Sequence, residues 1–186
     1  LGGRGVTFDL YCGAETILKG YNLRARAAVE RALTAHDIGL HCNSRVESVA
    51  AGSMQFADGR TADFDQLFWC TAAAAAPWLS GSGLATDEQG FLAVRDTLQS
   101  LGDDRVFAVG DCATQVNHPR PKAGVFAVRQ GPVLADNLRA WLQEQAPKPY
   151  RPQHRFLSLL SLGDKQATAD RGLFSATGGW VWRWKD

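Results

Sequence analysis

The sequence is poor in cysteine, and its cysteines are not arranged as a metal or disulfide site. Only four occur in 186 residues, and no two are spaced as C-x-x-C. This usage argues against a disulfide framework or a zinc site and favours reduced thiols in a cytoplasmic protein. The four are Cys12, Cys42, Cys70 and Cys112.

The chain also lacks an excess of charge and a long apolar run. With 20 Lys and Arg against 19 Asp and Glu, nothing points to nucleic acid as a partner. The longest apolar stretch, residues 67–79, is too short for a transmembrane helix and contains Pro77. We therefore expect a globular protein without a transmembrane segment, and a peripheral contact with a membrane stays open.

A third absence concerns nucleotide binding. The phosphate-binding pattern G-x-G-x-x-G, which joins the first strand of a dinucleotide-binding domain to its helix, occurs nowhere. The glycine-rich residues 1–5 (L-G-G-R-G) are a poor substitute, because they precede a predicted strand instead of opening a helix.

The most informative stretch that is present is V-F-A-V-G-D-C-A at residues 106–113. Four strand-forming apolar residues predict a buried parallel strand that ends at Gly110 and Asp111. Glycine permits close approach of the backbone to a ligand, and a carboxylate at a strand end suits sugar or ribityl hydroxyls. A plain Gly-Asp turn is the alternative.

The first third of the chain predicts a β-α-β unit followed by a small β-meander. Residues 5–12 and 38–41 are strand-like, and they flank a predicted helix at 23–36 that Asn22 caps. This order predicts a parallel crossover, as in dinucleotide-binding sheets. The meander strands are predicted at 45–49, 53–56, 61–64 and 65–70, with a hairpin turn at 58–59.

Strands and one long helix are predicted in the remainder. Residues 90–94 predict a strand, and residues 125–145 predict a helix that Pro132 interrupts. After a Pro-rich boundary, antiparallel strands are expected at 155–162, 165–171 and 173–177. The tail, residues 178–186, alternates three tryptophans along one predicted strand face, which favours a core or interface position. The fold class is therefore α/β, with partial Rossmann-like domains, parallel sheets, a small β-meander and a carboxyl-terminal antiparallel region.

Residues 90–100, 106–113 and 121–138 together resemble the second half of the FAD-binding domain in the pyridine nucleotide-disulfide oxidoreductase superfamily. The resemblance is strongest to single-flavin NAD(P)H dehydrogenases, in the branch associated with selenide, water dikinase. It implies three regions: residues 1–71 as the later part of an NAD(P)H-binding domain, 72–147 as the second part of an FAD-binding domain, and 148–186 as a carboxyl-terminal interface.

The resemblance also implies cofactors and a site. FAD would accept a hydride from NAD(P)H and pass electrons to a small-molecule acceptor: a quinone, a disulfide or a chalcogen species. Gly110 and Asp111 would hold the ribityl chain, a helix start would face the flavin ring, and Lys122 would add charge at the same edge, unless it is simply a solvated loop lysine. The implied cofactor-binding residues are Gly110, Asp111, Lys122, Ala123, Gly124, Val125 and Phe126.

Departures from the family pattern limit what the resemblance implies. Because both glycine fingerprints would lie upstream of residue 1, the chain is expected to be a carboxyl-terminal fragment that is inactive alone. The paired cysteines of disulfide-reducing members are missing, and no catalytic residue is identified. Asp9 and Glu15 lie too early and too late for a ribose-binding acid, so the choice between NAD and NADP stays open. The alternative is an interaction module with weak or lost redox activity, and the carboxyl-terminal sheet could form a homo-oligomer.

Overall fold

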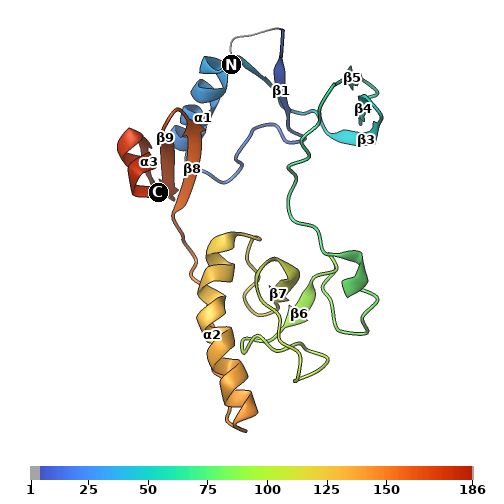
Figure 1. The fold of residues 1–186 in the computed structure, drawn as a ribbon, viewed down its shortest axis with the longest axis vertical. Coiled ribbons are helices and arrows are strands. Elements are labelled where there is room, and N and C mark those ends of the chain that lie inside the picture. Colours follow the sequence, from blue (N-terminus) through green and yellow to red (C-terminus); the bar gives the residue numbers. More distant parts are fainter. Residues whose placement is uncertain (1–4, 186) are drawn as a thin grey trace. The chain divides into compact units, whose positions relative to one another are not determined.

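The computed structural model describes residues 5–185, so the glycine-rich segment considered in place of a fingerprint lies outside it, apart from Gly5. The chain forms two compact units (Figure 1). Unit 1 combines Leu1–Phe68 with Arg155–Asp186, and unit 2 is the continuous segment Trp69–His154.

Unit 1 begins with the predicted β-α-β crossover. Strands β1 (Phe8–Tyr11) and β2 (Ile38–His41) pair in parallel, and helix α1 (Leu23–Ala35) connects them. Asn22 caps α1, because its side chain accepts a hydrogen bond from the backbone N–H of Arg24 at 2.8 Å. The prediction of a parallel crossover is confirmed.

The meander follows as β3 (Val46–Ala50), β4 (Ser53–Phe56) and β5 (Thr61–Asp63), which pair antiparallel in that order. The strand predicted at residues 65–70 is wrong. This segment is not paired with any described strand, and Phe68 and Trp69 are 83% and 56% exposed. An apolar run becomes a strand only where a neighbouring strand offers hydrogen-bonding groups.

The carboxyl-terminal sheet contains β8 (Ser158–Gly163), β9 (Gln166–Arg171) and β10 (Phe174–Gly178) in antiparallel order β10-β9-β8. It packs against α1. The backbone N–H of Asn22 donates to the buried carboxylate of Asp170 at 3.0 Å, and the Asn22 amide donates to the carbonyl oxygens of Gly172 and Leu173. One asparagine thus caps α1 and joins it to the last sheet.

The tail prediction is wrong in its secondary structure. Residues Gly179–Lys185 form helix α3 instead of a strand. In a helix, alternate residues point in nearly opposite directions, so the tryptophans do not share one face. Trp180 and Trp184 are more than half exposed, whereas Trp182 packs on the core formed by Ala167, Ala169 and Val181.

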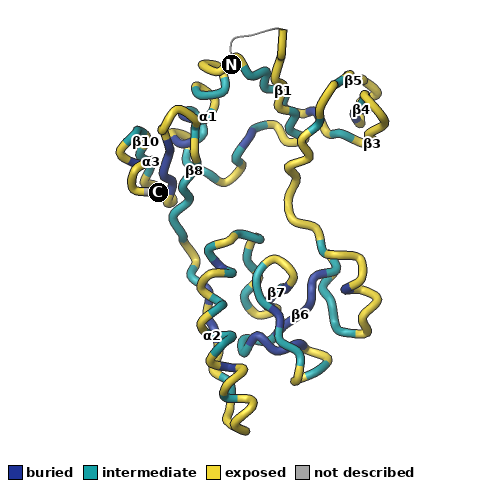
Figure 2. Tube along the Cα trace, viewed as in Figure 1, coloured by how far each residue is buried: buried dark blue, intermediate teal, exposed yellow. Residues whose placement is uncertain are grey.

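Unit 2 is built on the parallel pair β6 (Leu92–Val94) and β7 (Ala113–Gln115), which are largely buried (Figure 2). Helix α2 (Gly124–Leu142) confirms the long predicted helix, and Pro132 lies within it without ending it. Short 3₁₀ turns lie at η1 (Pro77–Leu79) and η2 (Gly110–Cys112).

The strand predicted at residues 106–109 is also wrong. This segment forms only a bridge between Gln99 and Phe107, with backbone hydrogen bonds that join Ser100 to Val106 and Ala108 to Leu98. The regular strand of this region is β7, which starts two residues after Asp111. Gly110 and Asp111 therefore occupy a turn that leads into a strand. The predicted fold class, α/β with parallel and antiparallel sheets, is confirmed.

Candidate cofactor site

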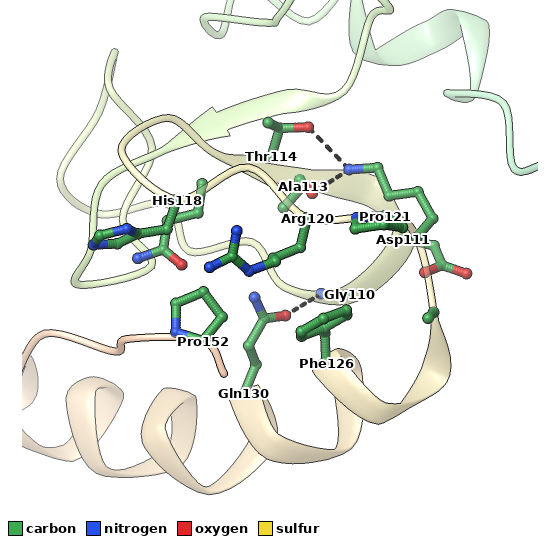
Figure 3. A pocket seen from close by; sticks show the side chains of 13 residues that line it. Gly110, Asp111, Ala113, Thr114, His118, Arg120, Pro121, Phe126, Gln130 and Pro152 are labelled. Carbon is green, nitrogen blue, oxygen red and sulfur yellow. Dashed lines mark hydrogen bonds between the residues drawn. The ribbon is translucent and has the colours of Figure 1, made fainter. Parts of the chain in front are cut away.

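A small cleft lies in unit 2 where η2, β7 and the start of α2 meet (Figure 3). Its cavity volume is about 30 Å³, far below the roughly 300–1,000 Å³ of a typical ligand pocket. These residues therefore supply one wall of a binding site and not a closed chamber. The lining residues are Gly110, Asp111, Ala113, Thr114, Gln115, His118, Arg120, Pro121, Lys122, Ala123, Phe126, Gln130 and Pro152.

Gly110 fixes the geometry of the turn that carries Asp111. Its φ of +68° lies in the left-handed region, which glycine adopts without strain. Its backbone N–H donates to Oε1 of Gln130 at 2.7 Å, as Figure 3 shows. A methyl group at Gly110 would lie 3.2 Å from Cβ of Ala127, so the turn and α2 are in close contact. Asp111 follows directly and is exposed.

Lys122 is tied to strand β7. Its ammonium donates to the carbonyl oxygen of Ala113 at 2.5 Å and to Oγ1 of Thr114 at 2.9 Å, and it lies 3.9 Å from the centre of the Phe91 ring. Burial lowers the pKa of Lys122, and the nearby carboxylates of Asp87 and Asp111 partly offset this. The ammonium is therefore a partly buried link between β7 and the loop before α2, not a solvated group.

Asp87 extends this network. Burial alone would raise the pKa of its carboxyl, but hydrogen bonds from the Thr114 hydroxyl and from the backbone N–H groups of Phe91 and Gln89 outweigh burial and lower it. Thr114 thus accepts from Lys122 and donates to Asp87. These contacts place the negative carboxylate of Asp87 and the positive ammonium of Lys122 on either side of Thr114, next to the cleft.

The start of α2 is open at its amino-terminal end. Ala123 occupies the N-cap position, and no side chain caps the helix. Gly124 and Val125 begin α2 but do not line the cleft, whereas the other predicted site residues, Gly110, Asp111, Lys122, Ala123 and Phe126, do. Uncapped N–H groups and the positive end of the helix dipole favour an electronegative ligand edge.

Some cleft residues were missed from the sequence. Gln130 could have been found, because Ala123, Phe126 and Gln130 recur at helical spacing and so share one face of α2. Arg120 and Pro152 lie in irregular segments, for which no periodicity exists.

The described residues show neither a metal site nor a membrane span. No group of three or more His, Cys, Asp or Glu side chains in residues 5–185 could hold a metal ion. None of the helices in that range has the length and apolar character needed to cross a bilayer. All four cysteines are free.

The parallel crossover of unit 1 and the turn at Gly110 and Asp111 against a helix start in unit 2 are features of α/β folds of the Rossmann-like class. Residues 7–131 match the family model described as pyridine nucleotide-disulphide oxidoreductase. The chain belongs to this family, whose members are oxidoreductases that use FAD and NAD(P)H.

Solved structures share the fold at low sequence identity. NDH2 of Plasmodium falciparum in complex with NADH matches 97% of the chain with a TM-score of 0.81 at 12% identity. Reduced CoADR-RHD of Bacillus anthracis matches 92% with a TM-score of 0.68 at 20% identity. An NAD-dependent persulfide reductase of A. fulgidus matches 88% with a TM-score of 0.65 at 18% identity.

The chain spans only part of these proteins: 54% of NDH2 and 31% of each of the other two. A comparison with curated protein sequences finds no match. The comparisons therefore show that the chain belongs to the pyridine nucleotide-disulphide oxidoreductase family and shares its fold. The activity of the whole protein is proposed below.

Proposed function

We propose that this chain carries part of the FAD-binding and NAD(P)H-binding regions of an FAD-dependent NAD(P)H oxidoreductase. The observation that supports this best is the turn at Gly110 and Asp111, which Gln130 holds against the uncapped start of α2. The turn offers an exposed carboxylate, and the helix offers backbone donors beside it. This donor and acceptor set fits a flavin with its ribityl hydroxyls.

Each group would have a separate role. Asp111 would accept hydrogen bonds from ribityl hydroxyls, and Gly110 would let the backbone approach them. The backbone N–H groups at the start of α2, where Ala123 and Phe126 line the cleft, would face the electronegative edge of the ring. Lys122 would contribute positive charge through the wall of the cleft. When bound, FAD supplies hydride and electron transfer between NAD(P)H and an acceptor, while the residues provide orientation and electrostatics.

In unit 1, the crossover of β1, α1 and β2 would form part of the NAD(P)H-binding region. Asp9 is engaged by His41, whose Nε2 lies 2.7 Å from Oδ1 of Asp9, so this carboxylate is already paired.

We propose a quinone, a disulfide or a chalcogen compound as the acceptor of electrons from the flavin. The resemblance further suggests a cytoplasmic enzyme associated with selenide, water dikinase, and assembly of copies through the carboxyl-terminal sheet.

The test is a titration of the full-length protein with FAD, followed by flavin fluorescence. We expect Asp111→Asn to weaken FAD binding about tenfold, because a charged acceptor is lost. The control Asp136→Asn removes an exposed acid of α2 that pairs with Arg139 outside the cleft, and it should leave binding unchanged. A folded full-length protein that does not bind FAD would overturn the proposal and favour an interaction module.

A second step separates flavin binding from hydride transfer. NADH and then NADPH are added without oxygen to the FAD-loaded full-length protein, and flavin absorbance is followed. Bleaching with one nucleotide supports the proposed reaction and identifies the donor. FAD that binds to the full-length protein but stays oxidised with both nucleotides contradicts the proposed hydride transfer.

A further inference from the structure

Two cysteines that are far apart in the sequence lie opposite each other in unit 1. Strand β1 ends at Tyr11 and β2 ends at His41, and these two residues are partners in the parallel register. Cys12 and Cys42 are the next residues of the two segments. We propose that they form a redox-active pair, which a low-molecular-weight disulfide such as glutathione disulfide converts into one reversible disulfide bond.

Backbone hydrogen bonds hold the two cysteines opposite each other. The N–H of Cys12 donates to the carbonyl oxygen of His41 at 2.8 Å, and the carbonyl oxygen of Cys12 accepts from the N–H of Ser44 at 2.9 Å. These two bonds lie on either side of Cys42 and Asn43, so the pairing continues past the ends of β1 and β2. The buried hydroxyl of Ser44 donates to the carbonyl oxygen of Cys42 at 3.2 Å and anchors the second segment further.

The two cysteine side chains are directed to the same side of the sheet. Tyr11 and His41 stack with their ring centroids 4.6 Å apart, so both of them lie on one side. Because successive side chains of an extended chain alternate, Cys12 and Cys42 are directed to the other side. Neighbouring strands lie about 4.7 to 4.9 Å apart, within the roughly 4.4 to 6.8 Å that a disulfide spans between Cα atoms. A disulfide is therefore compatible with this register.

Both thiols are available for oxidation. They are free and half-buried, so neither is enclosed in the core. The sulfur of Cys12 lies 3.9 Å from the carbonyl oxygen of Thr16, which is a long and weak hydrogen bond. Rotation about the Cα–Cβ bond exchanges this contact for a bond to the sulfur of Cys42. Gly13 and Asn43 follow the two cysteines outside the regular strands, so small backbone adjustments there leave the strand pairing intact.

The reaction is a thiol–disulfide exchange in two steps. The thiolate of one cysteine attacks a sulfur of the external disulfide, which gives a mixed disulfide and releases one thiolate. The thiolate of the second cysteine then attacks the protein sulfur of the mixed disulfide and releases the other half. The protein loses two electrons and two protons, and the external disulfide becomes two thiols. An excess of external thiol reverses both steps.

The position of the bond gives it a consequence for the sheet. In Rossmann-like folds, ligands bind at the carboxyl ends of the parallel strands, and Cys12 and Cys42 follow those ends directly. The disulfide would close residues 12–42, with α1 among them, into a covalent loop. The proposal does not depend on FAD, because the pair lies in unit 1 and the turn at Gly110 and Asp111 lies in unit 2. Failure of one proposal would leave the other standing.

The test is incubation of the full-length protein with glutathione disulfide, followed by alkylation of the remaining thiols and peptide mapping without reductant. Trypsin releases Cys12 in residues 5–19 and Cys42 in residues 32–45, and neither peptide contains another cysteine. We expect the two peptides to be recovered joined, with a mass lower by two hydrogens than their sum, and to separate after reduction with dithiothreitol.

Two variants show whether the pair is specific. Cys12→Ser should abolish the joined peptide and leave Cys42 bound to glutathione as a mixed disulfide. Cys42→Ser should have the corresponding effect on Cys12. The matched control is Cys70→Ser, which removes an exposed cysteine outside the pair and should leave the yield of the joined peptide unchanged. Circular dichroism checks that each variant is folded.

Oxidation in urea tests the role of the fold, because an unfolded chain has no strand register. The joined peptide should be at least about tenfold more abundant from the folded protein than from the unfolded one, since pairing raises the effective concentration of one thiol at the other. The proposal is overturned if Cys12 and Cys42 of the folded protein are recovered only as thiols or as separate mixed disulfides. Equal yields of the joined peptide with and without urea would also overturn it.

Discussion

The side-chain oxygen of Gln130 accepts a hydrogen bond from the backbone N–H of Gly110 at 2.7 Å. These residues lie twenty positions apart, one in the turn that carries Asp111 and the other two turns inside α2. The bond therefore joins the proposed acceptor of ribityl hydroxyls to the helix whose first turn is proposed to face the flavin ring. It also gives a polar backbone group at the cleft a partner within the protein.

Replacing Gln130 should loosen this turn. We expect Gln130→Leu to lower the free energy of unfolding by about 1 to 3 kcal/mol, because the N–H of Gly110 loses its acceptor. FAD binding should weaken together with stability. Gln130→Glu keeps an oxygen at the same position and should retain most of both properties. Chemical denaturation and FAD titration measure the two effects, and a Leu variant as stable as the unmodified chain would contradict the role of this bond.

Gly110 should tolerate no side chain. We expect Gly110→Ala to destabilise the chain by about 1 to 3 kcal/mol, because its φ of +68° disfavours other residues and the added methyl group meets Ala127. Gly59 is the matched control, since its φ is +84° but no atom lies within 4 Å of an added methyl group. Gly59→Ala should show the backbone strain alone and leave FAD binding intact. Equal effects of the two variants on FAD binding would contradict the close contact between turn and helix.

The network at Asp87 predicts a pH dependence in the acid range. The pKa of Asp87 lies below the ordinary value of 3.8, so the unfolded chain binds its proton more readily than the folded chain does. Its contribution to stability is complete above the ordinary pKa and is lost as pH falls through the lower, folded value. Denaturation between about pH 2 and about pH 5 should therefore show a shallower pH dependence for Asp87→Asn. Glu88→Gln, at the exposed neighbouring position, should keep the slope of the unmodified chain.

The tryptophans of α3 should differ in their importance. Trp182 packs on the core of Ala167, Ala169 and Val181, so Trp182→Ala should cost about 2 to 4 kcal/mol of stability. Trp180 is 54% exposed, and Trp180→Ala should change stability by no more than about 0.5 kcal/mol. Urea unfolding followed by circular dichroism measures both. Comparable losses would support a strand with all three tryptophans on one face.

Local signals were enough to predict part of the fold. The cap at Asn22, the Asp58-Gly59 hairpin and the two long helices were predicted from residues close in sequence, and the structure confirms them. The strands predicted at residues 65–70 and 106–109 needed partners that the apolar pattern cannot supply. The tail alternates like a strand, yet packing of Val181 on the last sheet favours a helix, so tertiary contacts overrode the local pattern.

The candidate site, like the fold, was predicted only in part from the sequence. The glycine, the acid and the helix start were visible as a motif, and the structure brings most of them to one cleft. Their role in binding FAD stays a prediction. The partners of Lys122 could not be predicted, because they depend on loop geometry and on burial, which follow no regular spacing in the sequence.

The bond between Asn22 and Asp170 has a consequence for the order of folding. It joins residues 148 positions apart, and unit 2 is inserted between the two segments of unit 1. During synthesis, residues 69–154 leave the ribosome as one continuous segment and can collapse around β6 and β7 first. Helix α1 must wait for the last sheet before its buried face is covered, so a helix that is synthesised before unit 2 is completed after it.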